Sequence, residues 1–516
     1  MNKKLTLDGI FGSGMVLQRE RQTSIWGRCA QGAAVSAMLD GEPCCVVCVD
    51  GRFTIKLAPQ QASRNHTIII ESENERITLE DVCFGDVFLL SGQSNMQLPV
   101  SRVQDVSAKE TEEADYPLIR HFVVEPRYFF GRQAEEIAPN PWTKGVYPEV
   151  MSMSAAGFFF ARRMYETLQV PIGLVLNAMG GSTIEAWMSE KLLGELGIST
   201  EVIRPFCDHK VFEDTISGEE KLFADWLEAL HTDDEEKQAC AIPEDAEPFR
   251  VPSMSFDTAL EDYTGSVWFY REVELESAPE GEGLVYLGDI IDSDRTYING
   301  TLVGETAYRY PPRKYPLPAG LLRKGKNLIA CRMVINGTAG GFVPDHYYYL
   351  DTGTERMDIS GEWMMKKQTE AAGSANVVLF PPILPTGLFN ASLYPLKGIE
   401  FAGALWYQGE SNADAPEGYS DKFTAMMNEW RAHLGQKLPV VCVELCDYVD
   451  PAVRVCDQSG WKEIQRQQRE QPAHTPDCAV ALASDLGESL ELHPQRKQEL
   501  GERLAKEMLC MVYGIK

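Results

Sequence analysis

The chain has 516 residues, of which 44% are hydrophobic and 24% charged, so it is too long for one compact core and suggests two to three domains. Its 76 acidic and 48 basic residues give a formal net charge of −28 at pH 7. This balance argues against nucleic acid and anionic membranes as partners, because both require clustered lysine and arginine.

The amino terminus begins with basic residues, but no apolar segment of signal-peptide length follows. No stretch is apolar and long enough to span a bilayer. Thirteen cysteines lack the spacing of a disulfide framework, so we predict a cytoplasmic protein, with secretion as the alternative if a leader has been removed. We interpret the cluster Cys44, Cys45 and Cys48 as a buried strand rather than a disulfide or metal site.

Residues 10 to about 82 alternate short β-forming runs with turns, including the hairpin-type pairs Asp40-Gly41 and Asp50-Gly51. From about 83 the pattern changes to strand, loop and helix, which is typical of an α/β domain. Residues 155–168 carry an apolar face and predict a helix, and a strand follows at 172.

The α/β rhythm stops after about 200, where an acid-rich connection over 209–250 precedes β-forming runs with a hairpin turn at Asn299-Gly300. It resumes near 384. The domains predicted are a small N-terminal β domain (1–82), a first α/β part (83–208), the connection with an inserted β-sandwich of jelly-roll type (209–383), and a second α/β part (384–516).

Four apolar runs of the α/β parts end in small, polar or acidic residues. In an open α/β sheet the ligand lies beyond the carboxyl ends of the strands, so these four ends should meet at one crevice. Singly each is an ordinary turn or helix cap, but together they supply a nucleophile, oxyanion donors and a general base for acyl transfer. The four ends are Gly92-Gln93-Ser94-Asn95, Gly180-Gly181-Ser182, Gln408-Gly409-Glu410-Ser411-Asn412, and Ser484-Asp485-Leu486-Gly487 with His493 shortly after.

These blocks resemble the signature blocks of SGNH hydrolases, and more narrowly those of the sialate O-acetylesterase branch of carbohydrate acetylesterases. The runs from Gly14 to Arg19 and from Ile25 to Gly27 are similar to the opening of that branch's N-terminal β domain. The resemblance implies an α/β fold with a three-layer α/β/α hydrolase domain. It also implies a serine esterase that removes O-acetyl groups from a carbohydrate, first of all O-acetylated sialic acid, through an acyl-enzyme.

Two alternatives stand beside this reading. A neutral acetylated hemicellulose such as xylan, mannan or xyloglucan is a second substrate class. A non-catalytic carbohydrate-binding protein on a hydrolase scaffold is a second kind of function.

Ser94 is the predicted nucleophile and His493 the predicted base, at the start of a helix that would begin at Pro494. The family's usual aspartate position, three residues before the histidine, is Leu490 here. We favour Asp485 as the acid that orients the imidazole. Glu488, Glu491 and a dyad without an acid are the alternatives.

The predicted oxyanion hole combines the Ser94 N–H, the amide of Gly180 or Gly181, and the side chain of Asn412. Three further polar residues, Gln93, Gln408 and Glu410, are expected to hold the loops together. No metal or cofactor is expected, since no Cys or His pairs have zinc spacing. The oligomeric state stays open.

Several aromatic and basic residues are candidates for sugar binding. Trp187, Trp406 and Tyr407 are more typical of a core than of a sugar-stacking surface. The tract from Asp345 to Tyr349 is either a substrate wall or a strand. The arginines considered for a sialate carboxylate are Arg309, Arg313 and Arg332.

Overall fold

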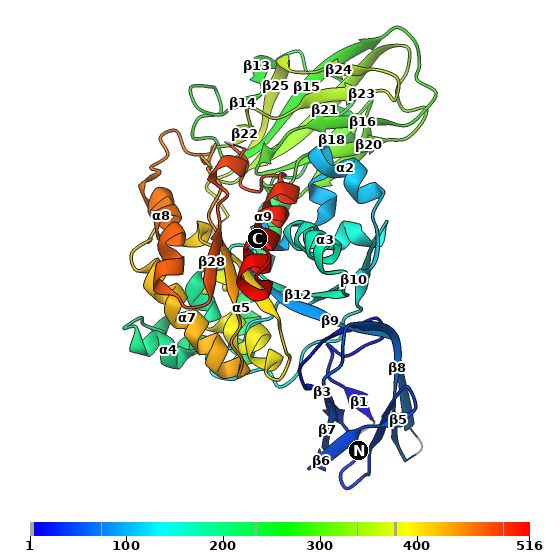
Figure 1. Ribbon diagram of the computed structural model, residues 1–516. Coiled ribbons are helices and arrows are strands. Elements are labelled where there is room, and N and C mark those ends of the chain that lie inside the picture. The colour runs from blue at the N-terminus through cyan, green and yellow to red at the C-terminus, as the bar shows by residue number, and fades with distance from the viewer. Residues whose placement is uncertain (1–4, 74, 233–234, 338, 376–378, 489) are drawn as a thin grey trace.

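The computed structural model describes residues 5–73, 75–232, 235–337, 339–375, 379–488 and 490–516. The first four residues, on which the expectation about a leader rests in part, lie outside these ranges. The structure confirms a mixed α/β protein with several sheets. An N-terminal β domain and an inserted β domain lie at opposite ends of a central α/β domain (Figure 1). In the described ranges no helix has the length and apolarity to cross a membrane.

The central sheet is parallel except for β11 at its edge. Its strands lie in the order β11-β10-β12-β9-β26-β27-β28, so strands later in the chain add to both sides of β9. The crevice at such a reversal of strand order is where open α/β sheets bind ligands. The strands are β9 (Glu75–Gly92), β10 (Asp115–Val123), β11 (Thr143–Val146), β12 (Ile172–Ala178), β26 (Gly403–Tyr407), β27 (Val440–Val443) and β28 (Cys478–Ala481).

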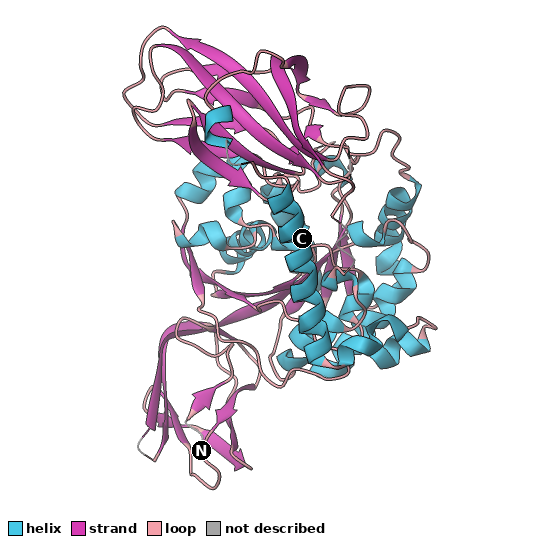
Figure 2. Ribbon diagram, turned by 180° about the vertical axis from the view of Figure 1, so that it is seen from behind, coloured by secondary structure: helices cyan, strands magenta, loops and turns pink. Residues whose placement is uncertain are grey.

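Helices cover both faces of this sheet (Figures 1 and 2). On one face α3 (Ala155–Leu168) packs against α9 (Lys497–Tyr513), and on the other α7 (Tyr419–Leu434) packs against α8 (Ser459–His474). The helix predicted over 155–168 is confirmed: the Ser154 hydroxyl accepts a hydrogen bond from Gly157 N at its start. The other α-helices are α1 (Ser94–Gln97), α2 (Gln104–Glu112), α4 (Glu190–Glu195), α5 (His209–Ala229) and α6 (Glu235–Gln238).

Strand β9 belongs to two domains. Its first half pairs with β8 in the N-terminal domain, and its second half is the central strand of the α/β sheet. The predicted turns Asp40-Gly41 and Asp50-Gly51 have positive φ at both residues and join adjacent strands. The N-terminal strands are β1 (Thr6–Leu7), β2 (Val16–Gln18), β3 (Thr23–Arg28), β4 (Ser36–Leu39), β5 (Glu42–Pro43), β6 (Cys45–Val49), β7 (Arg52–Leu57) and β8 (Ser63–Ser72).

The inserted domain consists of antiparallel sheets around its own apolar core. Its six-stranded sheet has the order β13-β25-β15-β21-β18-β19, and a four-stranded sheet has the order β20-β16-β23-β24. Asn299 and Gly300 form the hairpin turn between β18 and β19. The strands are β13 (Glu247–Val251), β14 (Ser253–Met254), β15 (Gly265–Leu275), β16 (Gly283–Leu287), β17 (Ile290–Ile291), β18 (Ser293–Ile298), β19 (Thr301–Thr306), β20 (Lys314–Leu317), β21 (Gly325–Ile335), β22 (Gly341–Phe342), β23 (Tyr348–Asp351), β24 (Arg356–Asp358) and β25 (Gly361–Glu370).

The cysteine cluster corrects one prediction. Cys45 and Cys48 do lie in a strand, β6, but β6 is exposed, with Val49 61% accessible, because the strand ends its sheet. A run of apolar residues cannot show whether a strand lies at an edge or in a core. The thirteen cysteines all lie in the described ranges, and none of them forms a disulfide.

Candidate active site

Ser94 lies at the carboxyl end of the central strand. Gly92 ends β9 with φ of 125°, and a Cβ there would lie 2.1 Å from the Tyr407 carbonyl oxygen of the neighbouring strand. Glycine is therefore required for β26 to pass so closely. Ser94 then begins the short helix α1, which puts its hydroxyl at the reversal of strand order.

His493 reaches Ser94 from the other end of the chain. Its Nε2 lies 2.8 Å from Ser94 Oγ, a hydrogen-bonding distance. The imidazole is 7% exposed, and burial, with the positive charges of Lys497 and Arg102, lowers the pKa of His493 to about 3. The α9 helix begins at Lys497, so the prediction of a helix from Pro494 is wrong, and His493 lies in the loop before it.

The structure pairs Asp485 with an arginine rather than with His493. Its carboxylate is 60% exposed and accepts hydrogen bonds of 2.6 and 2.7 Å from the Arg503 guanidinium, which lower the pKa of Asp485 to about 2. Arg503 faces it from α9, a pairing that sequence spacing did not reveal. Asp485 is thus part of a surface ion pair, and the described residues show no hydrogen bond between it and His493.

Glu491 is the acid beside His493. Its Oε1 accepts the His493 backbone N–H at 2.6 Å and lies 3.7 Å from His493 Nδ1. Nδ1 is buried and has no hydrogen-bond partner among the described residues. Glu488, the other alternative, accepts the Gln495 N–H at 2.7 Å and so anchors the loop.

Two glycine amides were candidates for the oxyanion hole, and the structure separates them. Gly180 N donates to Gln97 Oε1 at 3.1 Å, so that amide is occupied. Gly181 has φ of 72°, and the described residues offer its N–H no acceptor. Of the two glycines, Gly181 is therefore the one whose N–H can donate a hydrogen bond to a substrate.

Asn412, at the end of a 3-10 helix over Glu410–Asn412, ties two loops together. Its Oδ1 accepts from Ile184 N at 3.0 Å and Gln408 Nε2 at 2.7 Å. Its Nδ2 donates to Glu185 Oε2 at 3.0 Å, which leaves one amide hydrogen over.

The loop-holding residues behave as a network. Gln93 Oε1 lies 3.4 Å from the N–H groups of both Gly409 and Ser411, and Gln408 Nε2 donates to Ser182 O at 3.0 Å. Glu410 Oε1 accepts from Asn95 Nδ2 at 2.8 Å.

Asn95 was not among the predicted site residues, yet it connects the two ends of the site. Its Nδ2 also donates to Leu492 O at 2.9 Å, and its Oδ1 accepts from Lys497 Nζ at 2.7 Å. The nucleophile loop is thereby fixed to the residue next to His493. The sequence signal that could have identified Asn95 as a site residue is its position directly after Ser94 in the motif.

Aromatic residues around the site divide into buried and exposed sets. Trp187, Trp406 and Tyr407 are at most 2% exposed and belong to the core. The Tyr310 ring of the inserted domain meets the His493 ring edge to face at 5.2 Å. Phe380, 49% exposed, stands directly against Gly181.

The arginines that are candidates for binding a sialate carboxylate lie in different environments. Arg313 is fully buried on Asp294, and Arg332 is paired with Glu235, so both are structural. Arg309 pairs with Asp450 at 2.9 Å and lies over the Tyr310 ring. Arg102 donates to Tyr310 O at 3.1 Å, and its buried Nε has no partner among the described residues.

One group of possible metal ligands occurs in the described part of the chain. Asp289, His346 and Glu491 bring ligand atoms within 4.8 Å of one another. The two ends of the tract from Asp345 to Tyr349 differ in structure. Tyr348 and Tyr349 belong to strand β23, whereas His346 precedes the strand and has a ring nitrogen within 4.8 Å of a Glu491 carboxylate oxygen. Asp289 and Glu491 are both buried, at 5% and 4% exposed, and Asp289 Oδ1 has no hydrogen-bond partner among the described residues.

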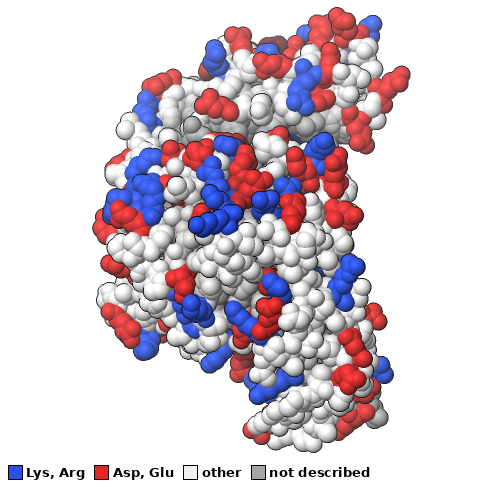
Figure 3. All heavy atoms as spheres, in the orientation of Figure 1, with Lys and Arg blue, Asp and Glu red and all other residues white. Residues whose placement is uncertain are grey.

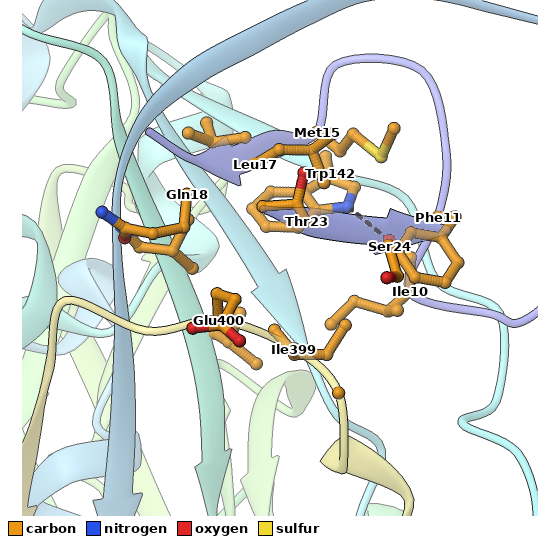
Figure 4. A pocket seen from close by; sticks show the side chains of 14 residues that line it. Ile10, Phe11, Met15, Leu17, Gln18, Thr23, Ser24, Trp142, Ile399 and Glu400 are labelled. Carbon is orange, nitrogen blue, oxygen red and sulfur yellow. Dashed lines mark hydrogen bonds between the residues drawn. The ribbon is translucent and has the colours of Figure 1, made fainter. Parts of the chain in front are cut away.

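Two cavities are notable. An apolar one of about 20 Å³, lined by Phe11, Trp142 and Ile399 among others, lies at the junction of the N-terminal domain and the central sheet, away from Ser94 (Figure 4). A larger one of about 480 Å³ lies between the inserted domain and residues 450–454, and Arg309 lines it beside Tyr310. On the face of the molecule shown in Figure 3, acidic and basic side chains are interspersed.

Residues 84–203 and 390–510 match the family model described as carbohydrate esterase, sialic acid-specific acetylesterase. The human sialate O-acetylesterase is 29% identical over 239 residues, which cover 43% of this chain and 44% of the relative. The rat sialate O-acetylesterase is 33% identical over 206 residues, covering 36% and 37%. The matches thus span less than half the length of these curated relatives.

A solved structure of a carbohydrate acetylesterase from Xanthomonas citri superposes with a TM-score of 0.60 at 19% identity. The match covers 99% of this chain and 76% of that one. At this identity it establishes a shared fold along almost the whole chain.

Proposed function

We propose that this chain, whose residues 84–203 and 390–510 match the family model of the sialic acid-specific acetylesterases, is a serine esterase that removes acetyl groups from a carbohydrate. The observation that carries the proposal is the 2.8 Å contact between Ser94 Oγ and His493 Nε2 at the reversal of strand order. A serine needs a base at this distance to become a nucleophile.

In the first half-reaction Ser94 Oγ attacks the acetyl carbonyl carbon while its proton passes to His493 Nε2. The negative charge on the carbonyl oxygen is stabilised by the N–H groups of Ser94 and Gly181 and the free amide hydrogen of Asn412. The tetrahedral intermediate then collapses: the bond to the sugar oxygen breaks, and that oxygen takes the proton from His493.

In the second half-reaction water attacks the acetyl group on Ser94. His493 takes the water proton and returns it to Ser94 Oγ as acetate leaves. Glu491 favours the imidazolium formed in each half. Its position 3.7 Å from Nδ1 requires a small movement to make the hydrogen bond when Nδ1 is protonated.

The substrate we propose is O-acetylated sialic acid. Arg102 and Arg309, which border Tyr310 above His493, are the cations available for its carboxylate. The 480 Å³ cavity beside Arg309 offers room for the rest of the glycan. Neutral acetylated hemicellulose is the second candidate, supported by the exposed Phe380 beside Gly181, since an aromatic face binds neutral sugars equally well.

The finer architecture is also proposed here. We assign the α/β domain to the SGNH type, with parts at 83–208 and 384–516, and the inserted sandwich to the jelly-roll type. We place the protein in the cytoplasm, which is supported by thirteen cysteines without a disulfide among them in the described ranges. A non-catalytic binding protein is disfavoured by the intact Ser94–His493 pair.

The test is hydrolysis of p-nitrophenyl acetate by the wild type and by Ser94→Ala, with Ser101→Ala as a control on an exposed serine nearby. We expect turnover by the wild type and the control, and none above background by Ser94→Ala. Equal rates in all three would refute the serine mechanism and favour the binding protein. Competition between acetylated sialic acid and acetylated xylan then identifies the substrate class.

A further inference from the structure

Lys497 occupies an unusual place for a lysine. It is the first residue of α9, where the helix dipole favours negative rather than positive charge. It is also only 1% exposed, although a lysine is almost never fully buried unless a partner compensates its charge. These two unfavourable placements indicate that the ammonium group has a specific partner.

The partner of Lys497 is the residue that follows the nucleophile. Lys497 Nζ donates a hydrogen bond to Asn95 Oδ1 at 2.7 Å and lies 5.3 Å from the centre of the Tyr407 ring. Tyr407 is buried at the end of β26, where it pairs with Gly92 of β9. Because an aromatic face attracts a cation, the ammonium group is held between Asn95 and Tyr407.

The contact with Lys497 determines which way the Asn95 amide points. An ammonium group can only donate, so it must face the amide oxygen, and the amide NH₂ group lies on the other side. From there Asn95 Nδ2 donates to Leu492 O at 2.9 Å and to Glu410 Oε1 at 2.8 Å. The orientation that Lys497 requires is therefore the one that makes both of these bonds.

The amide of Asn95 joins the two halves of the catalytic pair. Asn95 follows Ser94 in the chain and Leu492 precedes His493, so one side chain spans the two loops. Ser94 Oγ has its hydrogen bond with His493 Nε2, so Lys497 is placed to act on the loops rather than to accept the serine proton. A misplacement of about 1 Å between reacting groups can lower a rate about 10²-fold.

We propose that Lys497 is a positioning residue, which orients the Asn95 amide and so holds Ser94 at hydrogen-bonding distance from His493. The inference rests on the proposed esterase function and adds to it a residue that acts through Asn95 rather than on the reacting atoms. Without Lys497, Asn95 Oδ1 would lose its donor, and the amide would no longer be fixed from both sides.

A double-mutant cycle with p-nitrophenyl acetate tests this role. Lys497→Met keeps the length of the side chain but removes the donor, and it should lower kcat about 10- to 100-fold while KM stays within about twofold. Asn95→Ala should lower kcat at least as much. If Lys497 acts through Asn95, the double variant should lie within about twofold of Asn95→Ala, because the second change removes nothing further. Lys506→Met, the same substitution at an exposed position of α9, is the control and should match the wild type.

Several results overturn the proposal. Unchanged kcat in Lys497→Met would mean that Lys497 positions nothing. Losses that multiply in the double variant would mean that Lys497 acts independently of Asn95. If thermal unfolding shows that Lys497→Met does not fold, Lys497→Gln, which keeps a shorter donor, replaces it in the same cycle. Failure of both variants to fold would make Lys497 a residue of stability alone.

Amide hydrogen exchange supplies a readout that does not require turnover. Leu98 N donates to Ser94 O at 2.7 Å and so closes the helical turn that carries the nucleophile. In Lys497→Met the amides of residues 94–98 should exchange about 3- to 10-fold faster, whereas Lys506→Met should leave them unchanged. Unchanged exchange in Lys497→Met would refute the positioning role whatever the rate of hydrolysis. Faster exchange together with an inactive wild type would count against the esterase function alone.

Discussion

His493 has an environment that opposes its protonation. Its buried imidazole faces the positive charges of Lys497 and Arg102, and its pKa is lowered to about 3. A general base works only when neutral. An unperturbed histidine of pKa about 6.5 would be only about 3% neutral at pH 5, whereas His493 stays neutral there.

We therefore expect kcat/KM for p-nitrophenyl acetate to stay nearly flat between pH 7 and pH 5, with its acidic inflection well below 6.5. The measurement is a pH profile, and an inflection between 6 and 7 would contradict it.

The lowered pKa of His493 also affects the stability of the fold. Unfolded His493 takes up its proton near pH 6.5 and the folded form does not, so the free energy of unfolding falls as pH drops from there toward 3.

Glu491 and Asp485 form a matched pair for testing the orienting acid. Glu491→Gln should lower kcat by on the order of 10²-fold or more, because the amide no longer favours the imidazolium. Asp485→Asn should stay within about threefold, since it loses only a surface ion pair with Arg503. Both variants remove one carboxylate, so the difference reports position alone, and the opposite ranking would restore Asp485.

For single residues, the sequence indicated which residue types form the site better than it indicated which residues contact each other. Ser94 Oγ lies 2.8 Å from His493 Nε2, which agrees with the expectation that the strand ends meet at one crevice. The sequence favoured Asp485 over Glu491 because it does not show which partner each carboxylate meets: Arg503, which pairs with Asp485, lies 18 residues away on a helix.

Among the elements, α3 and α9 pack through a glycine. A Cβ on Gly501 would lie 2.5 Å from Phe159 Cβ and 2.6 Å from the Phe160 backbone nitrogen. In an isolated helix, glycine to alanine is stabilising by about 1 kcal/mol. In this protein the added methyl group would clash with the backbone of α3, and overpacking of this kind lowers the free energy of unfolding by about 1–3 kcal/mol.

We expect Gly501→Ala to be net destabilising, with a lower midpoint in urea unfolding, because the backbone contact outweighs the helix propensity. Lys506→Ala, exposed on the same helix, serves as control and should differ little from the wild type. A Gly501→Ala midpoint above that of the wild type would mean that the two helices can move apart without cost.

Elements with strong local signals were predicted well. The helix at 155–168 and the hairpin turn at Asn299-Gly300 depend on periodicity and on turn residues that accept positive φ. The start of α9 was misplaced because Pro494 fits either a first helical turn or the loop that carries His493. Exposure of β6 was missed because edge position depends on the whole sheet.

Across the whole molecule, Asp105 on α2 links the α/β domain to the insert. It accepts from Lys314 Nζ at 2.5 Å and Tyr286 Oη at 3.2 Å, both in the insert, and from Gln495 Nε2 at 2.9 Å, close to His493. Asp105 is thus fixed both to the second domain and to the loop of the base.

We expect Asp105→Ala to loosen this contact, with faster limited proteolysis between the domains and a kcat lowered about 3- to 30-fold through the loop of His493. Lys326→Ala, which removes an exposed ion pair with Glu272 on the insert, is the control. Unchanged proteolysis and activity in Asp105→Ala would show that other contacts dock the insert alone.

Strand β9 also has a consequence for how the protein is made. Its carboxyl half acquires β12 soon after synthesis, but its other neighbour, β26, begins only at Gly403, roughly 310 residues after Gly92. At about 5–20 residues per second a ribosome needs some 15–60 s to deliver that strand. During this interval the apolar strand that precedes the nucleophile has an open edge, the kind of surface on which chains aggregate. The nascent protein should therefore depend on chaperones until its last third emerges.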